Sequence, residues 1–341
     1  MKHRKKPALK IGVFFNPFAG NVNQFKDIAG SIEVLIAKVG GLLVTAAGDY
    51  GAEYLKHVSH TIVTGTEKYP DDLRRIVSGF CEWGTDIIIG IGGDGTLGYI
   101  AGILIEAGSR VPLMGVASGT ANVGPLLRFN QSKLQQIDLQ NLKFDPVGAI
   151  KVGRNGTAVG YAFIDTVIGK TFLGTRHGKS VNLDAKVFLN HGLKKTRPVC
   201  GLDKPSGIKV AKNDSLLFNC DEEISQIIVS PLHHSGFYVG KAITGLLCWA
   251  YPCNLAGAIM FSSCVIVDAE AELPSKAMKQ VQALFSREDT ITIEGVSGND
   301  YLIIDGNPTC PADGVLEFQF LPDAVLTVRD SENSILPIVV Q

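Results

Sequence analysis

The stretch DIIIGIGGDGTLGYIAGIL, residues 86–104, decides the fold of this chain. Its first part, Ile87 to Ile91, is a continuous apolar run rich in β-branched residues, which is typical of a strand buried on both faces. A glycine-rich turn follows at once, and Leu97 to Glu106 then has the spacing of a helix. A strand, a glycine turn and a helix bring backbone N–H groups and a helix N-terminus up to an anion such as phosphate. The stretch therefore predicts an α/β unit with a phosphate site at its turn.

The turn Gly92-Gly93-Asp94-Gly95-Thr96 indicates phosphoryl transfer. Its three glycines let the backbone approach a bulky anion without a Cβ in the way. Asp94 is the unexpected member, because a carboxylate beside phosphates is repulsive unless it binds a metal ion or accepts a proton from the attacking hydroxyl. A plain tight turn, in which Asp94 only caps the following helix, is the structural alternative.

This GGDGT turn resembles the signature shared by NAD kinases, diacylglycerol kinases and sphingosine kinases, which form one superfamily. The resemblance implies ATP and Mg²⁺ as cofactors. It places the nucleotide at Gly92, Gly93, Gly95 and Thr96, and it makes Asp94 a catalytic residue that serves the magnesium ion or the attacking hydroxyl.

Two other turns in the first half carry the same resemblance. NPFAG, residues 16–20, follows an expected strand at 11–15 and matches the NPxxG element that lies near the nucleotide in the superfamily. GTAN, residues 119–122, follows an expected strand at 111–116 and reproduces the GTxN element of lipid kinases. Residues 122–126 also fit the NxGxL element of NAD kinases. The further nucleotide-binding residues implied are Asn16, Gly119, Thr120 and Asn122.

The pattern changes around residues 145–146 to short alternating runs with glycine-rich turns, which is typical of a β-rich domain. NAD kinases and lipid kinases both follow their α/β domain with a β-sandwich, so the resemblance extends over nearly the whole chain. We expect a Rossmann-like α/β domain over 1–145, an all-β sandwich domain over 146–314, and C-terminal strands over 315–341 that pack back toward the first domain.

The second half carries segments that resemble the acceptor side of an NAD kinase. A strand at 226–229 leads into a loop similar to TPTGSTAY, with His233 and His234 in place of the central threonines. Asp165 falls where NAD kinases carry an Asn-Glu/Asp pair that holds the ribose, although Ile164 replaces the amide. The acceptor-binding residues implied are Asp165, His234, Ser235 and Tyr238. Residues 169–176 resemble divergent NAD-kinase-like proteins of the acetoin-catabolism protein X type.

A strand that ends in Asp305-Gly306-Asn307 supplies the last signal. It matches the DGQ of NAD kinases more closely than the DGE of lipid kinases, because Asn307 is a neutral amide. The resemblance makes Asp305 a second catalytic carboxylate beside Asp94. An ordinary Asp-Gly hairpin turn is the structural alternative.

Composition limits the cell compartment and the partners. The 341 residues include 32 Lys and Arg and 33 Asp and Glu, so nothing favours nucleic acid as a partner. No run approaches the ~20 apolar residues of a membrane span, which argues against stable membrane insertion. Seven cysteines without CxxC spacing fit a reducing cytoplasm. NAD kinases are commonly oligomers, so the resemblance makes a homo-oligomer plausible.

Three functional hypotheses follow. The first is an ATP-dependent kinase of the NAD kinase-like type, which phosphorylates a hydroxyl of NAD, as in NADP biosynthesis, or of a related small molecule. The second is a lipid kinase that acts on diacylglycerol or a sphingoid base, favoured by GTAN. The third is a nucleotide-binding regulatory protein without turnover, favoured by the missing threonines and amide.

Overall fold

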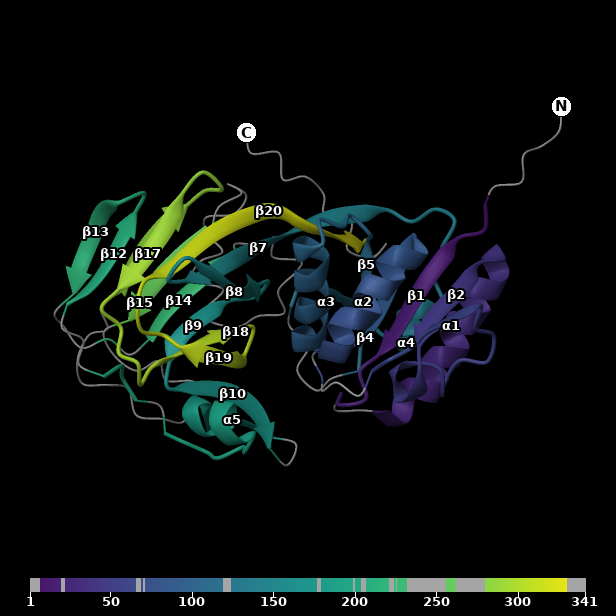
Figure 1. The fold of residues 1–341 in the computed structure, drawn as a ribbon, viewed down its shortest axis with the longest axis horizontal. Coiled ribbons are helices and arrows are strands. Elements are labelled where there is room, and N and C mark those ends of the chain that lie inside the picture. The colour runs from purple at the N-terminus through teal and green to yellow at the C-terminus, as the bar shows by residue number, and fades with distance from the viewer. Residues whose placement is uncertain are drawn as a thin grey trace. The chain divides into compact units, whose positions relative to one another are not determined.

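The chain forms two compact units (Figure 1). The computed structural model describes residues 7–19, 22–65, 69, 71–118, 124–176, 179–198, 200–203, 207–220, 224, 226–231, 256–261 and 280–329. The first unit comprises Met1–Val147 and Asp323–Gln341, and the second comprises Gly148–Pro322. Among the described helices, none is long and apolar enough to cross a membrane.

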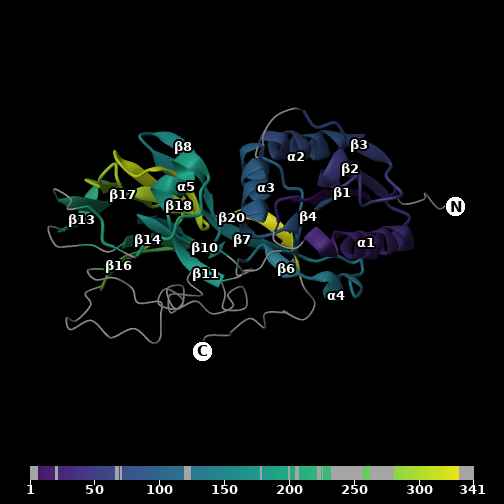
Figure 2. The same ribbon diagram turned by 90° about the horizontal axis from the view of Figure 1, so that it is seen from below.

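The first unit is a parallel sheet with helices on both faces. Its strands are hydrogen-bonded in the order β5-β4-β1-β2-β3, and β6 pairs with β5. Figure 2 shows α2 and α3 on one face of this sheet and α1 and α4 on the other. The elements are β1 (Lys10–Phe15), η1 (Val22–Gln24), α1 (Phe25–Val39), β2 (Leu42–Ala46), η2 (Gly48–Tyr50), β3 (His60–Ile62), α2 (Asp71–Trp83), β4 (Ile87–Gly92), α3 (Asp94–Glu106), β5 (Leu113–Ala117), β6 (Leu127–Phe129) and α4 (Gln131–Leu134). The α/β half expected from the sequence is confirmed.

Burial and close packing explain why β4 is a central strand and why residue 115 of β5 is a glycine. All six residues of β4 are buried, as expected for a central parallel strand covered on both faces. The chain after β5 passes so close to the sheet that a Cβ on Gly115 would lie 2.0 Å from the carbonyl oxygen of Leu126. Only glycine fits there. Because of this close approach, the segment that follows β5 lies beside the start of α3.

The second unit is a sandwich of antiparallel strands. One sheet has the order β16-β15-β14-β9-β18-β19, and the other contains β13-β12-β17-β20, with β7 paired to β8. A shared core joins the two sheets. Val210, Ile293 and Phe318 of the second sheet belong to the same buried cluster as Ile168 and Leu302 of the first. The β-sandwich expected from the sequence is confirmed, and the unit also contains one short helix, α5, among its described residues. The elements are β7 (Phe144–Arg154), β8 (Thr157–Ala162), β9 (Thr166–Gly169), β10 (Thr171–Arg176), β11 (Lys179–Asp184), α5 (Ala185–His191), β12 (Ile208–Lys212), β13 (Ser215–Cys220), β14 (Gln226–Pro231), β15 (Ala256–Phe261), β16 (Gln280–Phe285), β17 (Thr290–Glu294), β18 (Tyr301–Ile304), β19 (Asn307–Pro311) and β20 (Leu316–Val328).

Candidate functional site

The GGDGT turn joins the end of β4 to the start of α3. Gly93 is the N-cap residue of α3, with extended backbone angles of φ −106° and ψ −179°, and it has no side chain to cap the helix. Asp94 is the first residue of the helix, so the alternative in which Asp94 is the cap is wrong. A helix N-terminus that no cap side chain covers presents its N–H groups to an anion.

The glycines of this turn have different tasks. A Cβ on Gly92 would lie 2.8 Å from the Cβ and Oγ1 atoms of Thr96, so Gly92 permits the tight packing of the turn on the helix. A Cβ on Gly93 would meet none of the described atoms within 4 Å. Among the described residues, none fills the space in front of Gly93.

A buried hydrogen bond ties the NPFAG turn to the GGDGT turn. The Nδ2 atom of Asn16 donates to Oγ1 of Thr96 over 2.7 Å, and its Oδ1 accepts from the backbone N–H of Phe18 at 3.0 Å. The backbone N–H of Asn16 also donates to the carbonyl of Ile91 at 2.9 Å. These bonds hold the carboxyl ends of β1 and β4 in one fixed arrangement.

Asp94 is held by the chain that returns after β5. Its Oδ1 atom accepts a hydrogen bond from the backbone N–H of Gly124 at 3.0 Å. The bond joins GGDGT to the segment that follows GTAN. Within the described residues, no group of three or more His, Cys, Asp or Glu side chains gathers to hold a metal ion. Gly119, Thr120 and Asn122 lie outside the described residues.

An aromatic cluster, formed by Phe18, Tyr69 and Tyr99, borders the turn. The ring of Tyr69 packs edge to face against Phe18 at 5.5 Å and against Tyr99 at 6.5 Å. Phe18 is 71% exposed and Tyr99 is 46% exposed. Burial raises the pKa of the Tyr69 hydroxyl to about 12, while a hydrogen bond with the Thr96 side chain lowers it. The cluster therefore touches the GGDGT turn through Thr96.

Sequence reasoning missed this cluster. Tyr99 lies three residues after Thr96 on α3, and that spacing puts both on one helix face. Phe18 sits inside NPFAG itself. Those two signals were available, but Tyr69 comes from the connection between β3 and α2, and no local pattern singles it out.

In the second unit, Asp305 occupies a hairpin turn and also holds a neighbouring corner. Asp305 and Gly306 have φ values of 47° and 76°, which is the geometry of an Asp-Gly turn between β18 and β19. The Asp305 carboxylate accepts hydrogen bonds from the backbone N–H groups of Phe163 (2.9 Å), Ile164 (2.7 Å) and Asp165 (3.1 Å). Asp305 therefore forms an Asp-Gly hairpin turn with its backbone and binds the neighbouring corner with its carboxylate.

The same corner brings together other segments identified from the sequence. The backbone N–H of Asp305 donates to the carbonyl of Asp165 at 2.9 Å, and the hydroxyl of Ser230 on β14 donates to the carbonyl of Ile164 at 2.6 Å. Burial raises the pKa of Asp305 to about 7, although the backbone N–H groups oppose the rise and the charge of Asp165 adds to it. His234, Ser235 and Tyr238, which follow β14, lie outside the described residues.

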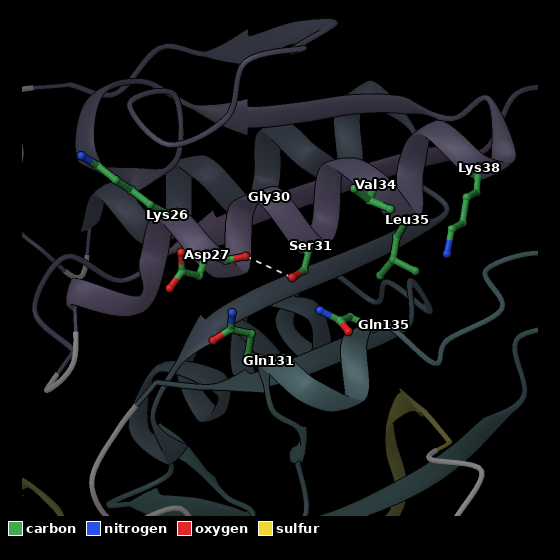
Figure 3. Close-up of a pocket in the computed structure, with 9 residues that line it drawn as sticks. All are labelled: Lys26, Asp27, Gly30, Ser31, Val34, Leu35, Lys38, Gln131 and Gln135. Atoms are coloured by element: carbon green, nitrogen blue, oxygen red, sulfur yellow. Dashed lines mark hydrogen bonds between the residues drawn. The ribbon is translucent and has the colours of Figure 1, made fainter.

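A groove of about 600 Å³ lies between α1 and α4 (Figure 3). Figure 3 shows Lys26 and Lys38 toward its two ends, with Gln131 and Gln135 opposite α1. None of the residues identified from the sequence lines it. The groove therefore does not belong to the GGDGT turn, which lies on the opposite, α3 side of the sheet.

One family model and one known protein match part of this chain. Residues 45–126 match the family model of the diacylglycerol kinase catalytic domain. An uncharacterized protein of Archaeoglobus fulgidus is 30% identical over 183 residues, which cover 53% of this chain and 55% of that protein. The match thus spans about half of the length of that relative.

Two solved structures are similar over nearly the whole chain. Yeast NADH kinase in complex with NADH is 12% identical, with a TM-score of 0.54, and the match covers 96% of this chain and 85% of that one. A putative diacylglycerol kinase from Bacillus anthracis is 15% identical, with a TM-score of 0.59 and coverage of 96% and 99%. The chain therefore has the fold of the superfamily that unites NAD kinases and diacylglycerol kinases, as its motifs indicate.

Proposed function

We propose that this protein is an ATP-dependent kinase of the NAD kinase-like type, which transfers a phosphoryl group to a hydroxyl of NAD or of a related small molecule. The observation that carries the proposal is the GGDGT turn. It combines an N-terminus of α3 without a side-chain cap, a space in front of Gly93 that no described residue fills, and a carboxylate at Asp94. Phosphoryl transfer depends mainly on such positioning and on charge stabilisation.

The phosphates of ATP bind the N–H groups of the turn and of the first residues of α3 in this proposal. Mg²⁺ ordinarily binds through one or two carboxylates together with phosphate oxygens, so the single carboxylate of Asp94 fits such a complex. The ion, when bound, spreads the charge of the transferred group. The bond from Gly124 holds the Asp94 carboxylate in one orientation, in which it binds the ion or accepts the proton of the attacking hydroxyl.

The aromatic cluster receives the nucleotide base in the same proposal. Phe18 and Tyr99 expose ring surface, and Tyr69 connects them to Thr96 at the phosphate turn. An exposed ring beside a phosphate site offers a stacking surface for any base, because every base has a π-face.

Asp305 acts as a positioning residue in this proposal. Its carboxylate already accepts bonds from the backbone N–H groups of Phe163, Ile164 and Asp165, so its direct effect is to fix that corner. The carbonyl of Ile164 in turn accepts a bond from Ser230 of β14. In the same proposal, the hydroxyl-bearing acceptor binds to Asp165, His234, Ser235 and Tyr238.

The lipid kinase hypothesis has one specific observation in its favour. The diacylglycerol kinase family model matches residues 45–126, which include the GGDGT turn and GTAN. Asn307 and the strand that enters the 232–238 loop favour the NAD kinase-like acceptor instead. A regulatory protein without turnover would bind ATP at the same turn and release no ADP.

Replacing Asp94 by Asn should reduce ADP formation from Mg²⁺-ATP and NAD by at least ~100-fold, because the variant loses the charge that the ion or the proton requires. The fold should persist, since the Asn Oδ1 atom can still accept the bond from Gly124. Coupled measurement of ADP release and a thermal melt test both statements. Asp323→Asn, at an exposed acid of the first unit, is the matched control. Undiminished turnover in Asp94→Asn would remove Asp94 from the mechanism.

Replacing Phe18 or Tyr99 by Ala should weaken ATP binding about tenfold, because base–aromatic stacking is lost. Binding of inorganic tripolyphosphate should not change, since it contacts only the turn. Isothermal titration with both ligands separates the two effects, and Phe144→Ala provides a partly exposed aromatic control on β7. Equal ATP affinity in the wild type and both variants would place the base elsewhere.

The Asp305→Asn variant tests whether burial or the three backbone hydrogen bonds dominate the pKa of the Asp305 carboxyl. Because burial raises its pKa from 3.8 to about 7, the folded state favours the protonated form. The wild type should therefore lose stability relative to Asp305→Asn as the pH rises from about 4 to 7, by roughly 2 kcal/mol or more. Urea unfolding across this range measures the difference. A wild type that instead gains stability with pH would show that the three N–H groups outweigh burial.

A further inference from the structure

A tyrosine that follows β2 is held firmly in place at the edge of the first sheet. Tyr50 is the last residue of the short helix η2. The chain packs closely at this point, because a Cβ on Gly51 would lie 1.9 Å from Oγ1 of Thr45, which donates to the carbonyl of Val13 on β1. The ring of Tyr50 also stacks on the buried ring of Phe14, with the two centroids 5.8 Å apart. Packing therefore fixes the position of Tyr50.

The hydrogen-bond partner of Tyr50 is a buried carboxylate. The Tyr50 hydroxyl donates to Oδ2 of Asp72, in the first turn of α2, at 3.3 Å. Asp72 is only 5% exposed, and no described residue gives a hydrogen bond to its buried Oδ1 atom. Burial raises the pKa of Tyr50 to about 12, and the charge of Asp72 adds to the rise. The hydroxyl therefore keeps its proton. Because an ionised carboxylate only accepts hydrogen bonds, that proton points toward Asp72.

This bond makes the Tyr50 oxygen an acceptor toward any further group. A hydroxyl whose proton is already engaged offers only its lone pairs. A hydrogen bond to a charged acceptor also polarises the hydroxyl and strengthens the next bond in the chain. The oxygen therefore attracts an N–H donor and repels a carbonyl oxygen. Tyr50 is half-buried, so a ligand can reach part of its side chain.

Tyr50 lies beside the aromatic cluster that receives the nucleotide base in the proposed function. Burial raises the pKa of Tyr69, and the nearby hydroxyls of Tyr99 and Tyr50 add to the rise, so Tyr50 lies within electrostatic reach of the cluster. The strand order β4-β1-β2 puts the end of β2 two strand spacings, or about 10 Å, from the end of β4 (Figure 1). A nucleotide with its phosphates at the GGDGT turn would extend over β1 and bring its base toward Tyr50.

We propose that Tyr50, oriented by Asp72, selects adenine by accepting a hydrogen bond from the exocyclic amino group of the base. That group is a donor in adenine, whereas guanine and hypoxanthine carry a carbonyl oxygen at the same position. The carbonyl would face the lone pairs of Tyr50 and leave both oxygens unpaired. Tyr50 is thus a base-binding residue, and Asp72 is a positioning residue that acts through it. This inference rests on the proposed function, from which it takes the place of the base.

Calorimetric titration of the full chain with Mg²⁺-ATP and Mg²⁺-ITP tests the proposal, because ITP carries a carbonyl where ATP carries the amino group. The wild type should bind ATP about tenfold more tightly than ITP. Tyr50→Phe keeps the ring on Phe14 and removes only the oxygen, so its affinities for the two nucleotides should agree within about twofold. A Tyr50→Phe variant that folds normally and keeps the full preference for ATP would overturn the proposal.

Asp72→Asn tests the orienting role of the carboxylate. An asparagine can donate to Tyr50 as well as accept from it, so the Tyr50 proton is free to turn toward the carbonyl of ITP. The preference for ATP should fall to about twofold or less. Asp71→Asn, at the exposed neighbour in the same turn of α2, should keep the full preference. If Asp72 were merely structural, its replacement would lower the melting temperature and leave the ratio of the two affinities unchanged. That result would overturn its assignment.

Titration with inorganic tripolyphosphate separates a failure of this inference from a failure of the proposed function. A wild type that binds tripolyphosphate, ATP and ITP, with equal affinity for the two nucleotides, would overturn the selection by Tyr50 and leave the kinase proposal standing. A wild type that binds neither tripolyphosphate nor either nucleotide would contradict the proposed function, and the inference would fall with it.

Discussion

The buried hydrogen bond from Asn16 to Thr96, 2.7 Å long, is the interaction on which the GGDGT turn depends. It joins the end of β1 to the first turn of α3, and Gly92 leaves room for the Thr96 side chain that receives it. A buried polar group that loses its partner costs about 1–3 kcal/mol. The turn is therefore rigid before any ligand arrives. A rigid site loses little entropy on binding, which is the benefit of preorganisation.

Backbone N–H groups hold the carboxylates at both sites described here. Gly124 donates to Asp94, and the corner that ends at Asp165 donates to Asp305. In each case the bond reaches across the fold to a segment distant in sequence. A carboxylate fixed in this way keeps one orientation. At Asp94 this suits a residue whose charge serves a ligand, whereas at Asp305 it joins the hairpin turn to the Asp165 corner.

Local patterns in the sequence predict most of the fold and the centre of the site. The apolar run of β4, the glycines after it and the Asp305-Gly306 turn each carry their own signal, because each conformation depends on neighbours in the chain. The contacts of Asp94 with Gly124 and of Tyr69 with Thr96 carry no such signal. They arise only when distant segments pack together.

Binding of Mg²⁺-ATP to Gly93→Ala tests the central claim, that phosphates occupy the space in front of the GGDGT turn. Gly93 has backbone angles that alanine adopts readily, and a Cβ there would meet no described atom within 4 Å. The variant should therefore fold normally yet block the phosphates. Calorimetry should show at least about a tenfold loss of ATP affinity. Gly30→Ala on α1, which is equally open, should bind ATP like the wild type. Unchanged ATP affinity in Gly93→Ala, with an unchanged thermal melt, would contradict the account.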